Sequence, residues 1–335
     1  QTWPNDLDYR GRRVIVVGSG ATAATLVPAI AADCAHVTML QRSPTYFFPH
    51  PNRNRLAETL RALDLDPLLV QDIVRRKVVY DQQRRFVDRA SSEPETVKAE
   101  LLATVAAHLP QEVVDEHFTP TYRPWQQRIA VVPDGDLFAA VRSGQASVVT
   151  DQIARLIPTG VALASGRELE ADIIVAATGF DLSILGDIAF SVDGRPLTFA
   201  ETVSYRGLMF TGIPNMAWVF GYLRAASWTL RVDLVTDFIC RLLNHMRAIG
   251  AARVGVELRA DDAQMQLAPF IDTSVFNPGY LMRGLELLPR GGDKPEWRHS
   301  QDYVYDRGVL PAVDLDDSCF AYADREGGRL RGGEG

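Results

Sequence analysis

The amino-acid sequence predicts an α/β chain whose first part is a doubly wound parallel sheet. Residues 12–17 form a β-branched apolar run that leads directly into a glycine-containing turn and then into a helical pattern. A second apolar run follows at 36–40, and a third, at 172–177, has the continuous apolar character of a strand buried on both faces. Because apolar strands that alternate with helical segments are typical of β-α-β units, residues 12–44 are expected to open such a sheet.

The first strand ends in the pattern GxGxxA, which spans 18–23. Gly18 permits a sharp exit from the strand, Gly20 leaves room for a pyrophosphate, and Ala23 lets the following helix pack close to the sheet. That helix is expected to begin near Ala21, where unpaired amides and the helix dipole favour negative charge. The pattern therefore predicts a Rossmann-like dinucleotide-binding turn, with a ligand-free strand-to-helix turn as the alternative. The predicted contacts are Gly18, Ser19, Gly20, Ala21, Thr22 and Ala23.

The end of the second strand indicates which coenzyme this turn would hold. It reads Gln41-Arg42-Ser43-Pro44 and carries no carboxylate, the group that an NAD site usually places there for the ribose 2′-hydroxyl. Arg42 and Ser43 instead suit a 2′-phosphate, because a guanidinium makes charge-assisted, bidentate hydrogen bonds to phosphate. We therefore expect NADP(H) rather than NAD(H); the alternative is that Arg42 is a solvated loop cation.

Composition limits the class of protein. The 335 residues carry a net charge of −7, which predicts about two globular domains and argues against nucleic acid as a partner. The three cysteines are widely spaced, so no disulfide framework, CxxC redox pair or metal site is expected, and a reducing cytoplasm is the predicted location. The sequence contains no run of about 20 apolar residues, so no transmembrane segment is predicted. The first residue is not Met, which indicates a fragment or a processed chain.

The pattern between the second and third predicted strands is helical and charged. Residues of about 45–118 are expected to form a helical insertion, in which Ser92 and Glu95 are a candidate capping box. The Arg-rich stretch 75–89 is expected to be a solvated helix face.

The sheet pattern returns at 146–149 and continues through a short hairpin around Gly160 and Gly166. An amphipathic helix is expected over 227–249, and the sequence after Gly250 indicates irregular structure. The predicted division is a dinucleotide-binding domain over 5–172, a second domain over 173–325 and a disordered tail over 326–335.

Several stretches together resemble the flavin- and NADPH-dependent monooxygenases, the class that includes Baeyer-Villiger monooxygenases. The stretches are GSGATA, QRSPTY, ATGF and PNMAWVFGY. Three longer stretches resemble the branch of the ethionamide-activating monooxygenase: HFTPTYRPWQQRIAVVPDGDLF, SYRGLMFTGIPN and GYLRAASWTLRVDLV. The resemblance extends from Gln1 to about Asp306.

The sequence also departs from the family pattern. In that family an earlier glycine-rich turn holds the ADP part of FAD, whereas GSGATA is the one such turn in this sequence. Of the fingerprint FxGxxxHxxxWP, Trp3 and Pro4 are present. The resemblance therefore implies an NADPH-binding domain plus the C-terminal part of an FAD-binding α/β domain, in an N-terminally truncated chain.

The resemblance implies a chemistry in which NADPH reduces FAD, reduced flavin forms a C4a-peroxyflavin with molecular oxygen, and a ketone or a sulfide is oxygenated. A fixed cation beside the flavin is then needed, and Arg128 lies about where the family's active-site arginine falls, with Arg123 as the reserve. A structural ion pair is the alternative for Arg128.

The resemblance also implies cofactor contacts from the ATG motif at Thr178 and Gly179, and from Asp172, for which a turn-capping carboxylate is the alternative. Asn215 and Gly221 match the segment that contacts flavin from the C-terminal side.

Three aromatic residues follow in this part of the sequence, Phe220, Tyr222 and Trp228. They are candidates for a substrate pocket, although core packing is favoured for them. The lone His36 and His117 are interpreted as structural, because neither has a partner at ligand spacing.

The leading hypothesis is a fragment of an FAD- and NADPH-dependent monooxygenase that is inactive alone, because most of the flavin-holding fold lies outside it. The alternatives are a non-catalytic NADP-binding module, or half of a split flavoprotein that joins an N-terminal FAD-binding partner. A disulfide reductase of similar plan would need a CxxC or CxxxxC pair, which the sequence lacks.

Overall fold

The computed structural model describes residues 3–223 and 227–330, and the chain forms two compact units. Unit 1 comprises Gln1–Arg75 and Asp88–Phe180, and unit 2 comprises Arg76–Val87 and Asp181–Gly335. The first unit therefore extends beyond residue 172, where the sequence indicates a boundary, because the strand after Asp172 pairs within the sheet of unit 1.

Unit 1 is built on a four-stranded parallel sheet with the order β5-β2-β1-β9. Its strands are β1 (Arg13–Val17), β2 (His36–Gln41), β5 (Ala146–Thr150) and β9 (Ile173–Ala176). This arrangement confirms the predicted α/β class with a parallel sheet.

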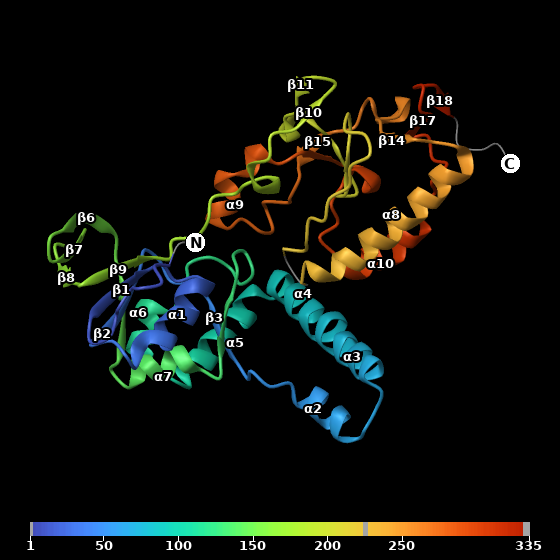
Figure 1. The fold of residues 1–335 in the computed structure, drawn as a ribbon. Helices are drawn as coiled ribbons and strands as arrows, with labels where there is room; N and C mark the ends of the chain where they lie inside the picture. The colour runs from blue at the N-terminus through green and yellow to red at the C-terminus, as the bar shows by residue number, and fades with distance from the viewer. Residues whose placement is uncertain (1–2, 224–226, 331–335) are drawn as a thin grey trace. The chain divides into compact units, whose positions relative to one another are not determined.

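The two faces of this sheet are covered differently (Figure 1). Val14 and Val16 of β1 point to a core shared with α1 (Ala21–Ala31) and α7 (Asp136–Arg142). Ile15, between them, points to the other face. There it packs against an antiparallel meander of β6 (Ile153–Ile157), β7 (Gly160–Leu163) and β8 (Glu168–Glu170).

The predicted insertion is helical, but part of it belongs to unit 2. Its elements are α2 (Arg55–Ala62), α3 (Pro67–Arg75), the π-helix η1 (Arg76–Gln83), α4 (Arg84–Ser92), α5 (Pro94–Ala106) and α6 (Gln111–His117). The capping box is wrong: Ser92 ends α4 and its hydroxyl donates to the Asp88 carbonyl, while α5 begins at Pro94 with no side-chain cap. The short parallel pair β3 (Phe47–His50) and β4 (Ala130–Pro133) flanks this insertion.

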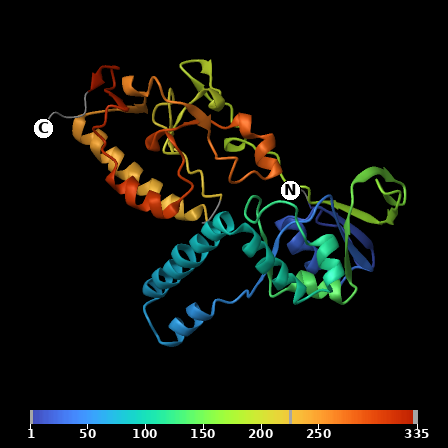
Figure 2. The same ribbon diagram turned by 180° about the vertical axis from the view of Figure 1, so that it is seen from behind.

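Unit 2 is organised around α8 (Thr229–Ile249), a 21-residue helix close to its predicted bounds. α10 (Tyr303–Val309) lies beside α8, as Figures 1 and 2 both show. The short strands are β10 (Ser191–Val192), β11 (Arg195–Pro196), β12 (Ser204–Tyr205), β13 (Met209–Phe210), β15 (Leu267–Pro269) and β16 (Arg290–Gly292). The remaining short helix is α9 (Gly279–Arg283), and 3-10 turns connect these elements.

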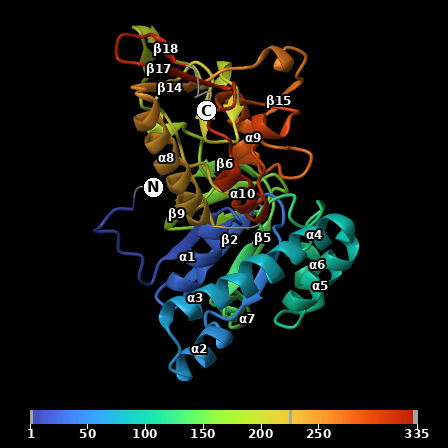
Figure 3. The same cartoon turned by 90° about the vertical axis from the view of Figure 1, so that its right-hand side faces the viewer.

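The chain after Gly250 is more regular than the sequence indicates. β14 (Arg253–Val256), β17 (Phe320–Ala323) and β18 (Arg329–Leu330) form an antiparallel sheet near one end of α8 (Figure 3). β18 therefore forms where a disordered tail is expected, and residues 331–335 of that tail lie outside the described residues. The pairing escaped sequence analysis because β14 and β17 are separated by a long, irregular stretch.

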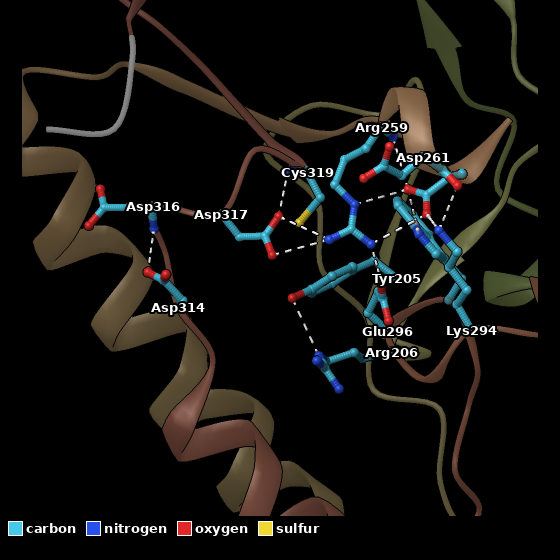
Figure 4. Close-up of polar contacts among 12 residues, drawn as sticks. Tyr205, Arg206, Arg259, Asp261, Lys294, Glu296, Asp314, Asp316, Asp317 and Cys319 are labelled. Carbon is cyan, nitrogen blue, oxygen red and sulfur yellow. Dashed lines mark hydrogen bonds and ion pairs between the residues drawn. The ribbon is translucent and has the colours of Figure 1, made fainter. Parts of the chain in front are cut away.

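A dense ionic cluster, none of whose members is a predicted site residue, stabilises unit 2 (Figure 4). Arg259 forms ion pairs with Asp262, Glu296 and Asp317, and Asp262 also accepts a hydrogen bond from the Trp297 indole at 3.0 Å. Burial opposes ionisation of Asp262, but the hydrogen bonds from Arg259, Lys294 and Trp297 outweigh it and hold its pKa well below the usual range. The cluster is thus a satisfied structural network.

Candidate functional site

Gly18 is held between the ends of two strands. Its amide donates to the Leu40 carbonyl at 2.8 Å, and its φ of +129° lies in a region that side chains disfavour. A Cβ at this position would lie 2.2 Å from the Ala177 carbonyl oxygen. Only glycine therefore lets β1 turn into α1 beside the ATG motif, as the GxGxxA pattern predicts.

The next glycine, Gly20, has open space beside it, whereas Gly18 is enclosed. Gly20 caps α1 without any side-chain hydrogen bond, and no heavy atom of the described residues lies within 4 Å of a Cβ built there. Ala21 and Thr22 are exposed, whereas Ala23 is fully buried against the sheet. The start of α1 therefore presents backbone amides to open space, which is the arrangement that a diphosphate requires.

The loop after β2 lies beside this turn. The Ser19 hydroxyl is 2.9 Å from the Thr45 hydroxyl and also donates to the Ser43 carbonyl at 3.5 Å. Arg42 and Ser43 are exposed, and Arg42 forms no ion pair with the residues that the structure describes. A guanidinium is thus left available next to the predicted phosphate site. Thr45 is not among the site residues predicted from the sequence, although its hydroxyl lies only three residues after Arg42.

The ATG motif joins the same edge of the sheet. The Ala177 amide donates to the Val17 carbonyl at 2.8 Å, so Thr178 and Gly179 follow directly from the point where Gly18 leaves β1. Both residues are exposed. The structure therefore brings the two motifs together at the carboxyl ends of parallel strands, where open α/β sheets bind ligands.

Asp172 lies at the other end of β9. Its carboxylate accepts the Arg13 amide at 2.7 Å and faces the Arg13 guanidinium, and these hydrogen bonds hold its pKa below the usual range. The register pairs Val14 with Ile173, so Asp172 sits at the start of the sheet and not at the GxGxxA edge. This geometry supports the alternative for Asp172, a carboxylate that caps the start of the strand.

Arg128 lies in unit 1, on the segment that enters β4. It is exposed and comes two residues before Ala130, whose amide donates to the Tyr46 carbonyl at 2.8 Å. Since Tyr46 follows Thr45, the backbone around Arg128 runs next to the loop that bears Arg42. Arg123, the reserve, is half-buried, and its amide donates to the Gln126 side chain at 3.3 Å.

The side chain of Asn215 is hydrogen-bonded within unit 2. Its side-chain oxygen accepts the Val254 amide at 2.9 Å, and its amide group donates to the Ala252 carbonyl at 3.3 Å. The polar groups predicted to contact flavin therefore bind β14 and the residue before it. The structure supports a role for Asn215 in fixing this strand.

Gly221 is also used for close packing. A Cβ there would lie 2.1 Å from Cβ of Trp228, the residue that precedes α8. The helix that was predicted to begin after Ala226 begins in the structure at Thr229, and residues 224–226 before it lie outside the described residues. Gly221 thus allows the chain to approach the start of α8 closely.

Two of the three candidate pocket aromatics belong to the core, as favoured from the sequence. Tyr222 is 2% exposed and its hydroxyl donates to Asp306 at 2.8 Å, while Phe220 packs on Trp218 and Phe270. Burial and the Asp306 charge raise the pKa of Tyr222. Trp228 is 60% exposed.

Tyr222 is part of a buried charged cluster. Asp306 also forms an ion pair with Arg231, which is fully buried, and accepts the Ser300 hydroxyl at 2.6 Å. The Arg231 guanidinium donates to the Arg206 carbonyl at 2.5 Å. Nearby, burial first and then the charge of Arg231 hold the pKa of His299 well below its usual value. The cluster joins α8 to α10, and Nε of Arg231 is the member atom left without a hydrogen-bond partner among the described residues.

The two lone histidines make sheet contacts, which supports their structural interpretation. The His36 ring lies 2.8 Å from the Ser147 hydroxyl, and the His117 ring lies 2.9 Å from the Thr150 hydroxyl. Burial is the main cause of the lowered pKa of His117.

Solved structures with the same fold include two complexes with NADP. An oxidized steroid monooxygenase bound to NADP matches 96% of this chain and 69% of its own, with a TM-score of 0.71 and 18% identity. The complex of OTEMO with FAD and NADP matches 96% of this chain and 68% of its own, with a TM-score of 0.66 and 16% identity. At these identities the likeness shows the fold.

Sequence comparison identifies the class. No protein-family model matches the sequence. Curated FAD-containing and FAD-binding monooxygenases nevertheless align with 96–97% of the chain at 40–43% identity. The chain is therefore homologous to FAD-containing monooxygenases over nearly all of its own length.

Among its relatives, the chain is 43% identical over 332 residues to the FAD-containing monooxygenase EthA of Mycobacterium tuberculosis. It is 42% identical over 323 residues to the probable FAD-binding monooxygenase AlmA of Acinetobacter baylyi. The alignments cover 97% and 96% of this chain but 65% and 64% of these relatives, so the chain spans about 65% of their length.

Among the described residues, no helix is both long and apolar enough to cross a bilayer.

Proposed function

We propose that unit 1 binds NADP(H) at the turn over 18–23. The observation that carries this proposal is the contrast within the turn: Gly18 is enclosed by Leu40 and Ala177, whereas Gly20 faces open space at the start of α1. The amides of α1 would hold the diphosphate, and Arg42 with Ser43 would hold the 2′-phosphate. Thr178 and Gly179 would contact the coenzyme from the neighbouring strand end.

Each part of this site has a defined task in binding. The start of α1 contributes partial positive charge without a side chain that could compete for the amides. Arg42 supplies a permanent charge with a planar fork of donors that matches a phosphate. When bound, the nicotinamide supplies a hydride; the residues of this chain orient it and select the 2′-phosphorylated coenzyme.

For the whole protein we propose an FAD- and NADPH-dependent monooxygenase that uses molecular oxygen to oxygenate a ketone or a sulfide. The homology to FAD-containing monooxygenases and the NADP and FAD complexes of the fold neighbours support this proposal. We propose that Arg128 acts in the active site of that whole protein. The cytoplasmic location predicted from the cysteine pattern stays a prediction.

The two residues of unit 2 that are predicted to contact flavin make contacts within that unit. Asn215 is hydrogen-bonded to Val254 and Ala252, and the space beside Gly221 is filled by Trp228. We therefore derive no step through FAD from these residues. We propose that this chain alone does not catalyse oxygenation.

A second candidate function is an NADP-binding module, or one half of a flavoprotein that joins a separate FAD-binding half. The favouring observation is that the open turn lies in unit 1, whereas the predicted flavin contacts of unit 2 are satisfied internally. The absorbance spectrum separates the possibilities: purified chain with flavin bands would contradict the proposal that it does not hold FAD.

The test of the proposed function is calorimetric titration with NADP⁺ and NAD⁺. Arg42→Ala is expected to weaken NADP⁺ binding by about 1–3 kcal/mol, the range for hydrogen bonds to charged groups, and to leave NAD⁺ binding nearly unchanged. Arg167→Ala, an exposed arginine between β7 and β8, is the matched control and should change neither. An equal loss for both coenzymes in Arg42→Ala would remove Arg42 from the 2′-phosphate site.

A further inference from the structure

We propose that Thr45 is a positioning residue for Arg42: its hydrogen bond to Ser19 ties the Arg42 loop to the phosphate-binding turn and thereby sets the preference for a 2′-phosphorylated coenzyme. This inference rests on the proposed function of unit 1. Thr45 itself lies one loop away from the GxGxxA pattern and acts through Arg42.

The residues on both sides of the Arg42 loop are firmly held. Gln41 is 1% exposed, and its side-chain amide donates to the His117 carbonyl at 2.6 Å and to the Thr150 hydroxyl at 2.9 Å. After the loop, Tyr46 is 1% exposed and its hydroxyl donates to the Tyr122 carbonyl at 2.7 Å. Residues 42–45 therefore span a short gap between fixed points.

Within that gap, the turn itself holds the loop. The Ser19 hydroxyl is 2.9 Å from the Thr45 hydroxyl and donates to the Ser43 carbonyl at 3.5 Å, so one side chain of the turn contacts two positions of the loop. Ser19 and Thr45 are both half-buried, which strengthens the bond relative to an exposed pair because water competes less for it.

The consequence concerns the distance between two binding groups. Ser19 directly precedes Gly20, and its contact with Ser43 lies one residue from Arg42. The hydroxyl bond thus fixes Arg42 relative to the amides of α1. A dinucleotide carries its diphosphate and 2′-phosphate at a limited range of separations, so a guanidinium held at the right distance loses less entropy on binding. A free loop would keep Arg42 but lose this advantage.

The test is a double-mutant cycle in the chain as it stands, with NADP⁺ and NAD⁺ as probes. Thr45→Val keeps the β-branched shape and removes the hydroxyl; it is expected to weaken NADP⁺ binding about threefold to tenfold, with less than about a twofold change for NAD⁺. Thr45→Ser keeps the hydroxyl and should restore NADP⁺ binding to within about twofold. In an Arg42→Ala background, Thr45→Val should weaken NADP⁺ binding by less than about twofold, because its effect on binding depends on Arg42.

Ser19→Ala breaks the same bond from the other side and serves as the second variant if Thr45→Val does not fold, as judged by circular dichroism. The inference is overturned if a folded Thr45→Val variant binds NADP⁺ with unchanged affinity. It is also overturned if Thr45→Val weakens NADP⁺ binding as much in the Arg42→Ala background as in the unaltered chain. In both cases the proposed function stands. If the unaltered chain binds neither coenzyme, the proposed function fails and this inference fails with it.

Discussion

Two segments of this chain resemble cofactor-contacting segments of one family, yet their chemistry differs. The turn over 18–23 leaves its glycine and its helix amides open, and Arg42 beside it has no ion pair within the described residues. In the segment over 215–221, the Asn215 side chain accepts a hydrogen bond from Val254 of β14, and Gly221 packs closely against Trp228. The comparison teaches that a matched motif indicates a fold position, whereas a binding site also needs unsatisfied groups and free space.

The largest effect is expected from the buried charges of unit 2. Asp306→Ala leaves Arg231 buried without its carboxylate and should lower the free energy of unfolding by about 3–5 kcal/mol, measured by urea denaturation. Binding of NADP⁺ at a temperature where the variant is folded should not change, because unit 1 carries the turn.

Glu257→Ala is the matched control for that variant. Glu257 pairs with Arg329 at 2.9 Å, and both side chains are mostly exposed, so the unfolding free energy should change by less than about 1 kcal/mol. Similar losses for Asp306→Ala and Glu257→Ala would show that the cluster around Arg231 does not stabilise unit 2.

A smaller but more selective effect is expected at the open glycine. Gly20→Val places a branched side chain where the diphosphate would lie and should weaken NADP⁺ binding more than about tenfold, by calorimetry. Because the Gly20 φ of −79° is open to any residue, the unfolding free energy should change by less than about 1 kcal/mol. Gly255→Val, on β14 and also without neighbours at the Cβ position, is the control and should leave NADP⁺ binding intact.

The last prediction concerns the dependence of the unfolding free energy on pH. Asp262 has a pKa held below its ordinary value by Arg259, Lys294 and Trp297, so its stabilising contribution is present above the unfolded carboxyl pKa of about 3.9 and is lost as pH falls through the lower folded value. Urea unfolding between pH 6 and pH 2 should therefore show stability falling at the acid end, with a shallower fall in Asp262→Asn. Parallel curves for the two proteins would exclude Asp262 as a source of the acid sensitivity.

The fold of unit 1 could be predicted because its signals are local. Each strand is a short apolar run, Gly18 must be glycine where β1 leaves the sheet, and Ala23 must be small where α1 packs. The strands β14 and β17 were missed because their partners are far apart in the sequence, so no local period reports the pairing.

The candidate site was predictable in part for the same reason. Arg42 and the glycines follow from spacing, but the end of β9 at which Asp172 lies, and the contact of Thr45 with Ser19, depend on register and on loop packing. The internal use of Asn215 likewise depends on β14, which lies about 40 residues later in the sequence.

Hydrogen exchange measured by mass spectrometry, with and without saturating NADP⁺, tests the central claim most directly. The account predicts slower exchange over 18–24 and 42–45 on binding, and no change over 215–221. Protection confined to 215–221, or saturation by NADP⁺ with unchanged exchange over 18–24, would contradict it.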